Sequence, residues 1–266
     1  MHTFLLIAAF VWIYPFLWMI SASFKTQNDF FASGLSLIPK EIVFDNFIRA
    51  WNNANFSQYF LNSIVVTVSV VFIVLISSSC AGYVLGRYAF VGKQVALSIF
   101  VASITIPLVF TVIPVYEMLK TMGLNQSLLG LILAESGGGQ VVFLMLFSSF
   151  FAQLPMEMEE AAKIDGCGFW QTYTKVMFPL AKPIIVTVVI MQFIWTWNSF
   201  LLPLIITLNK PSIRTLAVGM YALKGENVVD WTGISAGATI SILPVIIIFI
   251  ALQKYFVDGI AGAVKS

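Results

Sequence analysis

Charged residues are scarce in this sequence. They make up 10% of its 266 residues, whereas an average soluble domain carries roughly a quarter. Apolar residues make up 59%. Because a helical membrane span needs about 20 apolar residues, a chain of this length can hold several spans joined by short connections. This composition excludes a soluble globular protein and leaves no room for a large soluble domain beside the spans.

Residues that carry catalysis or hold metals are also few. The only histidine is His2, and the two cysteines, Cys80 and Cys167, lie far apart without neighbouring ligands, so we expect free thiols and no metal site. The motifs of zinc proteases, serine hydrolases and disulfide oxidoreductases are absent, and residues 86–93 do not fit a phosphate-binding loop. We therefore expect no enzyme and no cofactor on this chain. The scattered Lys and Arg residues form no basic stripe, which excludes nucleic acid as a partner.

Stretches without charge predict the membrane spans, because a charged side chain at mid-bilayer costs about 2.5–3.5 kcal/mol. Five such stretches are long enough to cross, and a sixth contains only one charged residue, Glu135. The six stretches are residues 3–24, 59–85, 94–116, 128–150, 183–209 and 231–253. Alternating ten-residue strands are absent, so the sequence predicts an all-α integral membrane protein with six transmembrane helices and both termini on one side.

The start of the chain is interpreted as a retained first span, because it lacks a basic residue and its apolar stretch is longer than that of a signal peptide. The positive-inside rule leaves the orientation open, since Lys and Arg divide seven against seven between the two faces. The face that carries residues 151–182 has the shorter connections and hence the denser positive charge. This density favours that face as the cytoplasmic one.

The connection at residues 151–183 has the features of two short helices. Acidic residues at its start complement a helix dipole, Glu159 and Lys163 have the spacing of an ion pair, and Gly166 can end the first helix. Phe169, Tyr173 and Val176 follow at helical spacing, and with Trp170 and Met177 beside them they form a largely aromatic stripe. Taken alone, the stripe fits either an interfacial helix resting on the membrane or a helix offered to a groove in a partner protein.

The order of residues in this connection resembles a known motif. Glu160-Ala161-Ala162, three residues, Gly166, nine residues, Val176, one residue and then Phe178-Pro179 follow one another. This order is similar to the EAA motif of binding-protein-dependent ABC importer permeases, which usually ends in Ile, any residue, Leu-Pro. Val176 and Phe178 are conservative departures from it. The resemblance implies a cytoplasmic loop whose helices dock into a cleft of an ATP-hydrolysing subunit.

The same resemblance implies partners, location and the residues that couple the chain to its ATPase. The partners are a second permease subunit, two ATPase subunits that hold ATP and Mg, and an extracytoplasmic solute-binding protein, all at a prokaryotic plasma membrane. Residues 1–58 would form the first helix and an external loop, 59–258 a five-helix core, and 259–266 a cytoplasmic tail. The implied coupling residues are Glu160, Ala161, Ala162, Asp165, Gly166, Phe169, Tyr173, Val176 and Pro179.

Short strings elsewhere resemble the carbohydrate branch of this family, particularly its second permease subunit. They are Ser23-Phe24-Lys25, Asp45-Asn46-Phe47, Trp197-Asn198 and the tail from Phe256 to Lys265. A mono- or oligosaccharide is therefore the expected substrate, although related branches carry amino acids, peptides or polyols. Family members usually have a basic cytoplasmic segment before the first span, so we expect a truncated start. A secondary transporter without ATP is the competing class, and it would show buried charge pairs or inverted halves.

Four residues are candidates for the substrate pathway: Glu135, Gln140, Trp197 and Asn198. Glu135 and Gln140 flank a glycine run in the fourth predicted span, where a carboxylate is either functional or hydrated near the membrane surface. Asn198 offers an amide beside aromatic rings, which suits a sugar and equally suits helix packing or an interfacial aromatic belt.

Two pairs of glycines have the GxxxG spacing that allows helices to pack closely. These pairs are Gly82 with Gly86 and Gly233 with Gly237. We interpret both as packing faces rather than ligand sites.

Overall fold

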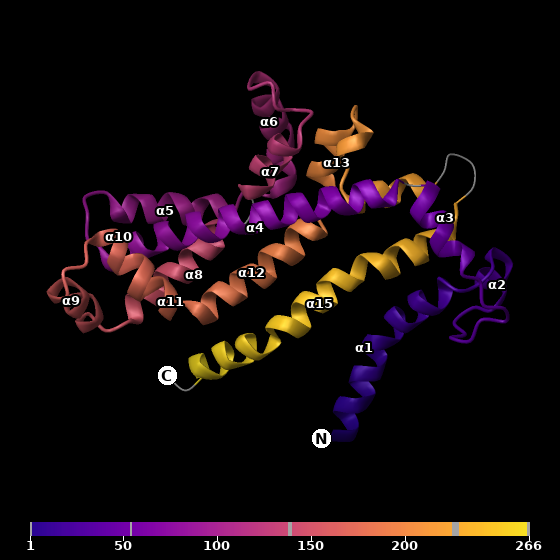
Figure 1. The fold of residues 1–266 in the computed structure, drawn as a ribbon, viewed down its shortest axis with the longest axis horizontal. Helices are drawn as coiled ribbons and strands as arrows, with labels where there is room; N and C mark the ends of the chain where they lie inside the picture. The colour runs from indigo at the N-terminus through magenta and orange to yellow at the C-terminus, as the bar shows by residue number, and fades with distance from the viewer. Residues whose placement is uncertain (1, 54, 138–139, 225–228, 265–266) are drawn as a thin grey trace. The chain divides into compact units, whose positions relative to one another are not determined.

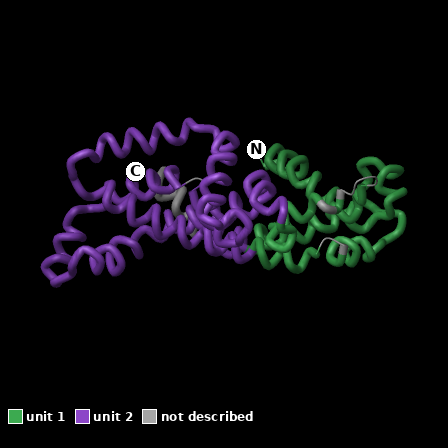
Figure 2. The backbone as a smooth tube through the Cα atoms, turned by 90° about the horizontal axis from the view of Figure 1, so that it is seen from above, with its two compact units in different colours: residues 1–63, 210–247 green, residues 64–209, 248–266 purple. Residues whose placement is uncertain are grey.

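The computed structural model describes residues 2–53, 55–137, 140–224 and 229–264, and every regular element within those ranges is helical (Figure 1). The predicted all-α fold class is confirmed. The chain forms two compact units, which Figure 2 colours separately: residues 1–63 with 210–247, and residues 64–209 with 248–266. Two of the three unit boundaries fall inside long helices, α4 (Phe56–Arg87) and α15 (Trp231–Val264).

Each unit contains several further helices. The first unit also holds α1 (His2–Ala22), α2 (Gln27–Ala32), α3 (Asp45–Asn53), the 3-10 turn η2 (Pro211–Ile213), α14 (Leu216–Met220) and the 3-10 turn η3 (Tyr221–Lys224). The second unit holds α5 (Lys93–Ile104), α6 (Leu108–Thr121), α7 (Leu128–Ser136), α8 (Gln140–Gln153), α9 (Glu157–Ile164), α10 (Phe169–Thr172), the π-helix η1 (Tyr173–Met177), α11 (Phe178–Leu180), α12 (Lys182–Trp197) and α13 (Leu201–Thr207).

Among the described residues, three helices are long and apolar enough to cross a membrane unbroken: α1, α4 and α15 as far as Lys254. Three further candidates are bent pairs, so the count reaches six if each pair is one span. The bends are 106° between α5 and α6, 49° between α7 and α8, and 77° between the stretch Phe169–Leu180 and α12. The topological division at residues 58 and 258 stays a prediction.

The third and fifth predicted spans differ from straight crossings. Within 94–116 the helix stops before Pro107, whose backbone is extended with ψ 129°, because proline lacks an N–H and disfavours helical angles in the residue before it. Within 183–209, α12 ends at Trp197 and α13 begins anew at Leu201. There the side-chain amide of Asn198 donates to the carbonyl of Ile194 at 2.8 Å, a local bond that competes with helix continuation.

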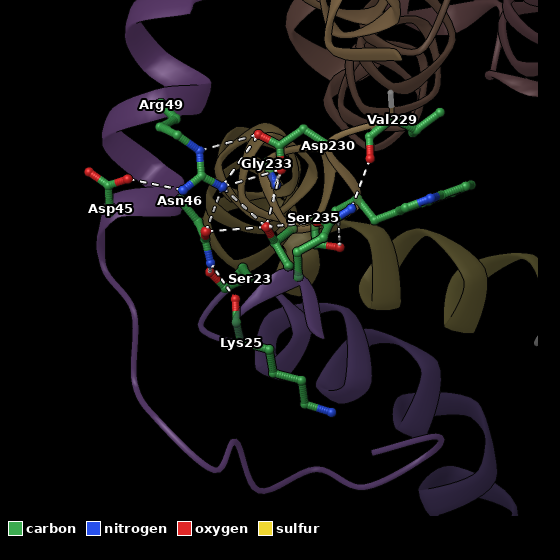
Figure 3. A network of polar contacts seen from close by, with 12 residues as sticks. Ser23, Lys25, Asp45, Asn46, Arg49, Val229, Asp230, Gly233 and Ser235 are labelled. Carbon is green, nitrogen blue, oxygen red and sulfur yellow. Dashed lines mark hydrogen bonds and ion pairs between the residues drawn. The ribbon is translucent and has the colours of Figure 1, made fainter. Parts of the chain in front are cut away.

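A polar network in the first unit holds the start of α15 to α3 (Figure 3). The Asn46 side chain donates to the carbonyls of Ser23 and Lys25, each at 2.8 Å, and the Arg49 guanidinium reaches Asp230 at 3.3 Å. Burial opposes the charge of Asp230, but hydrogen bonds from the Gly233 N–H and from Arg49 outweigh it and lower the pKa of this carboxyl. The strings around residues 23–25 and 45–47 therefore meet in one place.

Close helix packing in the second unit depends on two glycines of α4. A Cβ added to Gly82 would lie 2.5 Å from the Cβ of Phe147, and one added to Gly86 would lie 2.6 Å from the carbonyl oxygen of Ser148. Both contacts are with α8, and no real Cβ approaches other atoms so closely. The interpretation of this pair as a packing face is confirmed.

The two glycines of the second pair, in the first unit, have different neighbours. Gly233 leaves room for the carboxylate of Asp230, which would lie 2.4 Å from an added Cβ. Gly237 faces a ring edge of Phe56 at 3.3 Å from such a Cβ. The interpretation as a packing face is therefore confirmed for Gly237, which faces α4, and not for Gly233.

Candidate functional site

The connection at residues 151–183 contains two helical pieces that separate at Gly166, beside the end of α4 (Figure 1). α9 ends in a Schellman motif: the Gly166 N–H donates to the carbonyl of Lys163 at 3.0 Å and the Cys167 N–H to that of Ala162 at 2.9 Å. Gly166 has φ +78°, a left-handed conformation that side chains resist. The glycine therefore stops α9 as the sequence predicts.

The second helical piece is less regular than the sequence predicts. It runs from Phe169 to Leu180 through α10, η1 and α11, and its central segment is a π-helix in which the Phe178 N–H donates to the carbonyl of Tyr173 five residues earlier. Single π turns inside helices are frequent at functional sites. A bend of 77° then leads into α12.

The loop buries one set of side chains and exposes another. Ala162, Tyr173 and Met177 are buried, whereas Ile164 and Trp170 are 86% and 65% exposed. The remaining implied coupling residues divide in the same way: Glu160, Ala161, Asp165, Gly166, Phe169 and Pro179 are exposed, and Val176 is half-buried. We call Glu160, Ala161, Ile164 and Trp170 the exposed face of the loop.

One stripe of α4 supports the buried side of the loop. Ser79 and Tyr83 lie one turn apart on this helix: the Ser79 hydroxyl lies 2.7 Å from that of Tyr173, and the Tyr83 ring lies 5.5 Å from Phe169 and 5.4 Å from Tyr173. One turn further, Arg87 Nε donates to Glu159 Oε1 at 2.7 Å. Sequence reasoning missed all three stripe residues, although their spacing of four along a span was visible.

The ion partner of Glu159 corrects a prediction. The sequence suggested Lys163, four residues further along the same helix, but Glu159 is buried and pairs with Arg87 instead. The carboxylate points into the protein, so it meets a basic residue from α4. Lys163 is exposed.

The candidate pathway residues do not all come together. Glu135 is buried and accepts a hydrogen bond from the Ser199 hydroxyl at 2.6 Å, which joins α7 to the segment after α12. Trp197 is also buried and stacks on Phe193 with ring centroids 5.5 Å apart. Asn198 is exposed and its amide turns back onto its own helix.

The remaining candidate, Gln140, is the half-buried first residue of α8. The glycines at 138 and 139 lie outside the described residues.

A polar stripe on α12 escaped the sequence analysis. The Gln192 amide donates to the Thr196 hydroxyl at 2.8 Å, and both side chains are buried. Ser199, three residues further and just past the end of α12, donates to Glu135. Among the described residues, Gln192 Oε1 is buried without a hydrogen-bond partner. We call Gln192, Thr196, Ser199 and Glu135 the polar stripe; its first two members could have been found as uncharged polar residues spaced four apart.

The family model described as binding-protein-dependent transport system inner membrane component matches residues 78–262. The chain belongs to this family. As a permease subunit of an ABC importer it is a multi-pass protein of the plasma membrane and a transporter component, so the prediction that it is not an enzyme is confirmed.

Relatives of this permease cover its whole length. The diacetylchitobiose uptake system permease protein of Streptomyces coelicolor is 32% identical over 100% of this chain and 86% of the relative. A probable starch degradation products transport system permease protein of Thermoanaerobacterium thermosulfurigenes is 35% identical over 98% of this chain and 94% of the relative.

A solved structure shares the fold. The crystal structure of a bacterial ABC transporter involved in the import of the acidic polysaccharide alginate contains a chain that matches with a TM-score of 0.81 at 24% identity. The match covers 96% of this chain and 94% of the other.

Proposed function

We propose that this permease imports a mono- or oligosaccharide, with a second permease subunit, two ATPase subunits that bind ATP and Mg, and an extracytoplasmic solute-binding protein. The observation that carries the coupling part is the exposed face of the loop. Ile164 and Trp170 are large apolar side chains left 86% and 65% exposed on a loop whose Glu159 and Tyr173 are buried against α4. Exposed apolar side chains grouped with a charge suit a groove in a partner protein.

In this proposal the loop and both termini face the cytoplasm, where ATP is hydrolysed. α9 presents Glu160, Ala161 and Ile164 one turn apart or adjacent, so they share a face. The small Ala161 permits close approach, and Glu160 adds a charge that a basic side chain of the ATPase subunit can pair. The Schellman ending at Gly166 makes the loop a fixed shape rather than a flexible linker.

Charge reversal on the exposed face tests the coupling role. We expect Glu160→Lys to reduce the amount of ATPase subunit that co-purifies with the permease by about tenfold, as for loss of one good interface contact. The matched control is Glu157→Lys, which reverses an exposed charge in the first turn of the same helix outside the motif. Equal recovery of the ATPase subunit with Glu160→Lys and wild type contradicts the docking role.

The polar stripe supports the carbohydrate part of the proposal. A sugar hydroxyl both donates and accepts hydrogen bonds, and the stripe offers an amide, two hydroxyls and a carboxylate. A buried acceptor left without a donor costs about 1–3 kcal/mol, so a hydroxyl reaching Gln192 Oε1 during the transport cycle would gain binding energy. The names of the relatives, for diacetylchitobiose and starch products, agree with this substrate class.

Substitutions in and beside the stripe test the pathway. We expect Gln192→Leu to raise the substrate concentration for half-maximal uptake by about 3–10-fold, the loss of one hydrogen bond, with normal assembly. We expect Asn198→Ala to lower the rate of uptake, again with normal assembly of the transporter. The control Thr187→Val removes a hydroxyl whose one hydrogen bond within the described part of the chain is to the carbonyl of Pro183, four residues earlier on the same helix. Unchanged uptake by both test variants, measured in vesicles, assigns these residues a structural role.

A further inference from the structure

We infer that Arg87 attaches the coupling loop rigidly to α4, so that movement of the loop is transmitted to this transmembrane helix. We call the ion pair of Arg87 with Glu159 the joint. The inference rests on the proposed coupling role of the loop. It assigns a positioning role to Arg87 and Glu159, neither of which belongs to the exposed face.

The Arg87 guanidinium directs all of its nitrogens at one segment. Nε donates to Glu159 Oε1 at 2.7 Å, and Nη1 donates to the carbonyls of Leu154 at 2.6 Å and Phe151 at 3.3 Å. Nη2 donates to the carbonyl of Pro155 at 3.3 Å and contacts Met156 Sδ at 3.2 Å. These five contacts match the five N–H donors of a guanidinium. One side chain from α4 therefore binds the connection between α8 and α9 along its whole length.

Burial strengthens the ion pair at the centre of these contacts. The side chains of Arg87 and Glu159 are 5% and 3% exposed, so water screens their attraction little while they are paired. Removing one partner of a buried ion pair leaves the other charge without compensation, which is far more costly than loss of a surface pair. The carbonyls at the end of α8 also form the negative end of its dipole, which favours the guanidinium.

The surrounding contacts prevent α4 from moving independently of the loop and α8. Gly82 and Gly86 bring α4 into backbone contact with α8, while Ser79 and Tyr83 hold the second half of the loop through Tyr173 and Phe169. The two halves of the loop are thus attached to the same stripe of α4, with the ion pair at its end. A displacement of α9 therefore has to move α4 as well.

Arginine and lysine differ at such a site. Lysine keeps the charge but has no planar fork, so it cannot hold Glu159 and the carbonyls of Leu154 and Phe151 in fixed directions. Arg87→Lys and Glu159→Gln therefore loosen the joint while leaving the exposed face intact. Lys93→Met is the matched control, because Lys93 follows α4 closely and its ammonium has one hydrogen bond among the residues that the structure describes, to the carbonyl of Tyr88 at 3.1 Å.

The experiment uses the complete transporter in vesicles with its binding protein and sugar. Uptake per ATP hydrolysed and hydrogen exchange of the amides at residues 157–164 are both measured. We expect Arg87→Lys and Glu159→Gln to keep the ATPase subunit, to lose about tenfold in uptake per ATP, and to exchange about tenfold faster in α9, in line with the loss of a buried charge pair. Lys93→Met should match wild type in both.

Faster exchange with unchanged uptake per ATP overturns the inference, because the pair then only stabilises the loop. If either variant fails to assemble, the double variant Arg87→Met with Glu159→Met leaves no unpaired buried charge and is expected to fold. In the assembled double variant, full coupling overturns the inference and lost coupling supports it. Failure of the proposed function has a different signature. In that case Glu160→Lys, measured in parallel, retains both the ATPase subunit and uptake.

Discussion

Gly166→Val is expected to leave the permease in the membrane and to reduce sugar uptake by about tenfold or more. The glycine has φ +78° and nothing within 4 Å of the position of a Cβ, so the strain comes from the backbone alone. A residue other than glycine costs about 1–2 kcal/mol in this region, and a β-branched one is a clear outlier. Relief of the strain would undo the Schellman ending and turn α10 away from α9. Uptake and co-purification of the ATPase subunit, measured separately, check the prediction.

The control for this prediction lies two residues away. Gly168 also has nothing within 4 Å of an added Cβ, but its φ of −76° and ψ of 175° suit any residue. Gly168→Val should therefore retain near-normal uptake. An interfacial helix without a partner predicts normal uptake for both variants, so wild-type behaviour of Gly166→Val removes the loop shape from the mechanism.

Gly82→Ala is expected to reduce the yield of folded permease rather than its coupling. The added Cβ would meet the Cβ of Phe147 at 2.5 Å and the backbone of α8 at 3.0 Å, and neither can rotate away. Overpacking of this kind costs about 1–3 kcal/mol. Thermal stability of the detergent-solubilised complex, followed by gel filtration after heating, should fall by several degrees.

Gly137→Ala tests whether any glycine in a candidate span would behave in this way. Its added Cβ would lie 3.5 Å from the carbonyl oxygen of Ala134, an ordinary contact, and its φ is −74°. This variant should retain wild-type stability. Equal stability of Gly82→Ala would show that α4 and α8 can separate without loss.

Local patterns accounted for much of the fold and for the shape of the loop. Charge-free stretches predicted where apolar helices lie, since the cost of charge in a bilayer is a property of single residues. Gly166 was predictable because the left-handed ending of a helix is also local. Pro107 carried a local signal too, but a test for charge alone did not weigh it, so the 106° bend between α5 and α6 was missed.

Contacts between distant residues could not be predicted in the same way. Glu159 and Arg87 are 72 positions apart, and the rule for neighbours on one helix offered Lys163 instead. Gln192 and Thr196 carry no charge, so a search for charge-free stretches could not distinguish them from the rest of the span. Asn198 was selected instead because tryptophans lie beside it in the sequence. The π-helix at Tyr173–Met177 has no sequence signature that the periodic pattern could show.

The attachment of the loop to α4 affects how a permease could be engineered to use a different ATPase subunit. To make this chain accept a foreign ATPase, one would replace the loop, residues 151–183, with that of another permease. The buried side of the loop contacts Ser79, Tyr83 and Arg87 of α4. A transplanted loop would therefore place foreign side chains against these three residues unless α4 is changed with it. The portable module is the loop together with the last three turns of α4, two pieces far apart in the gene that have to travel together.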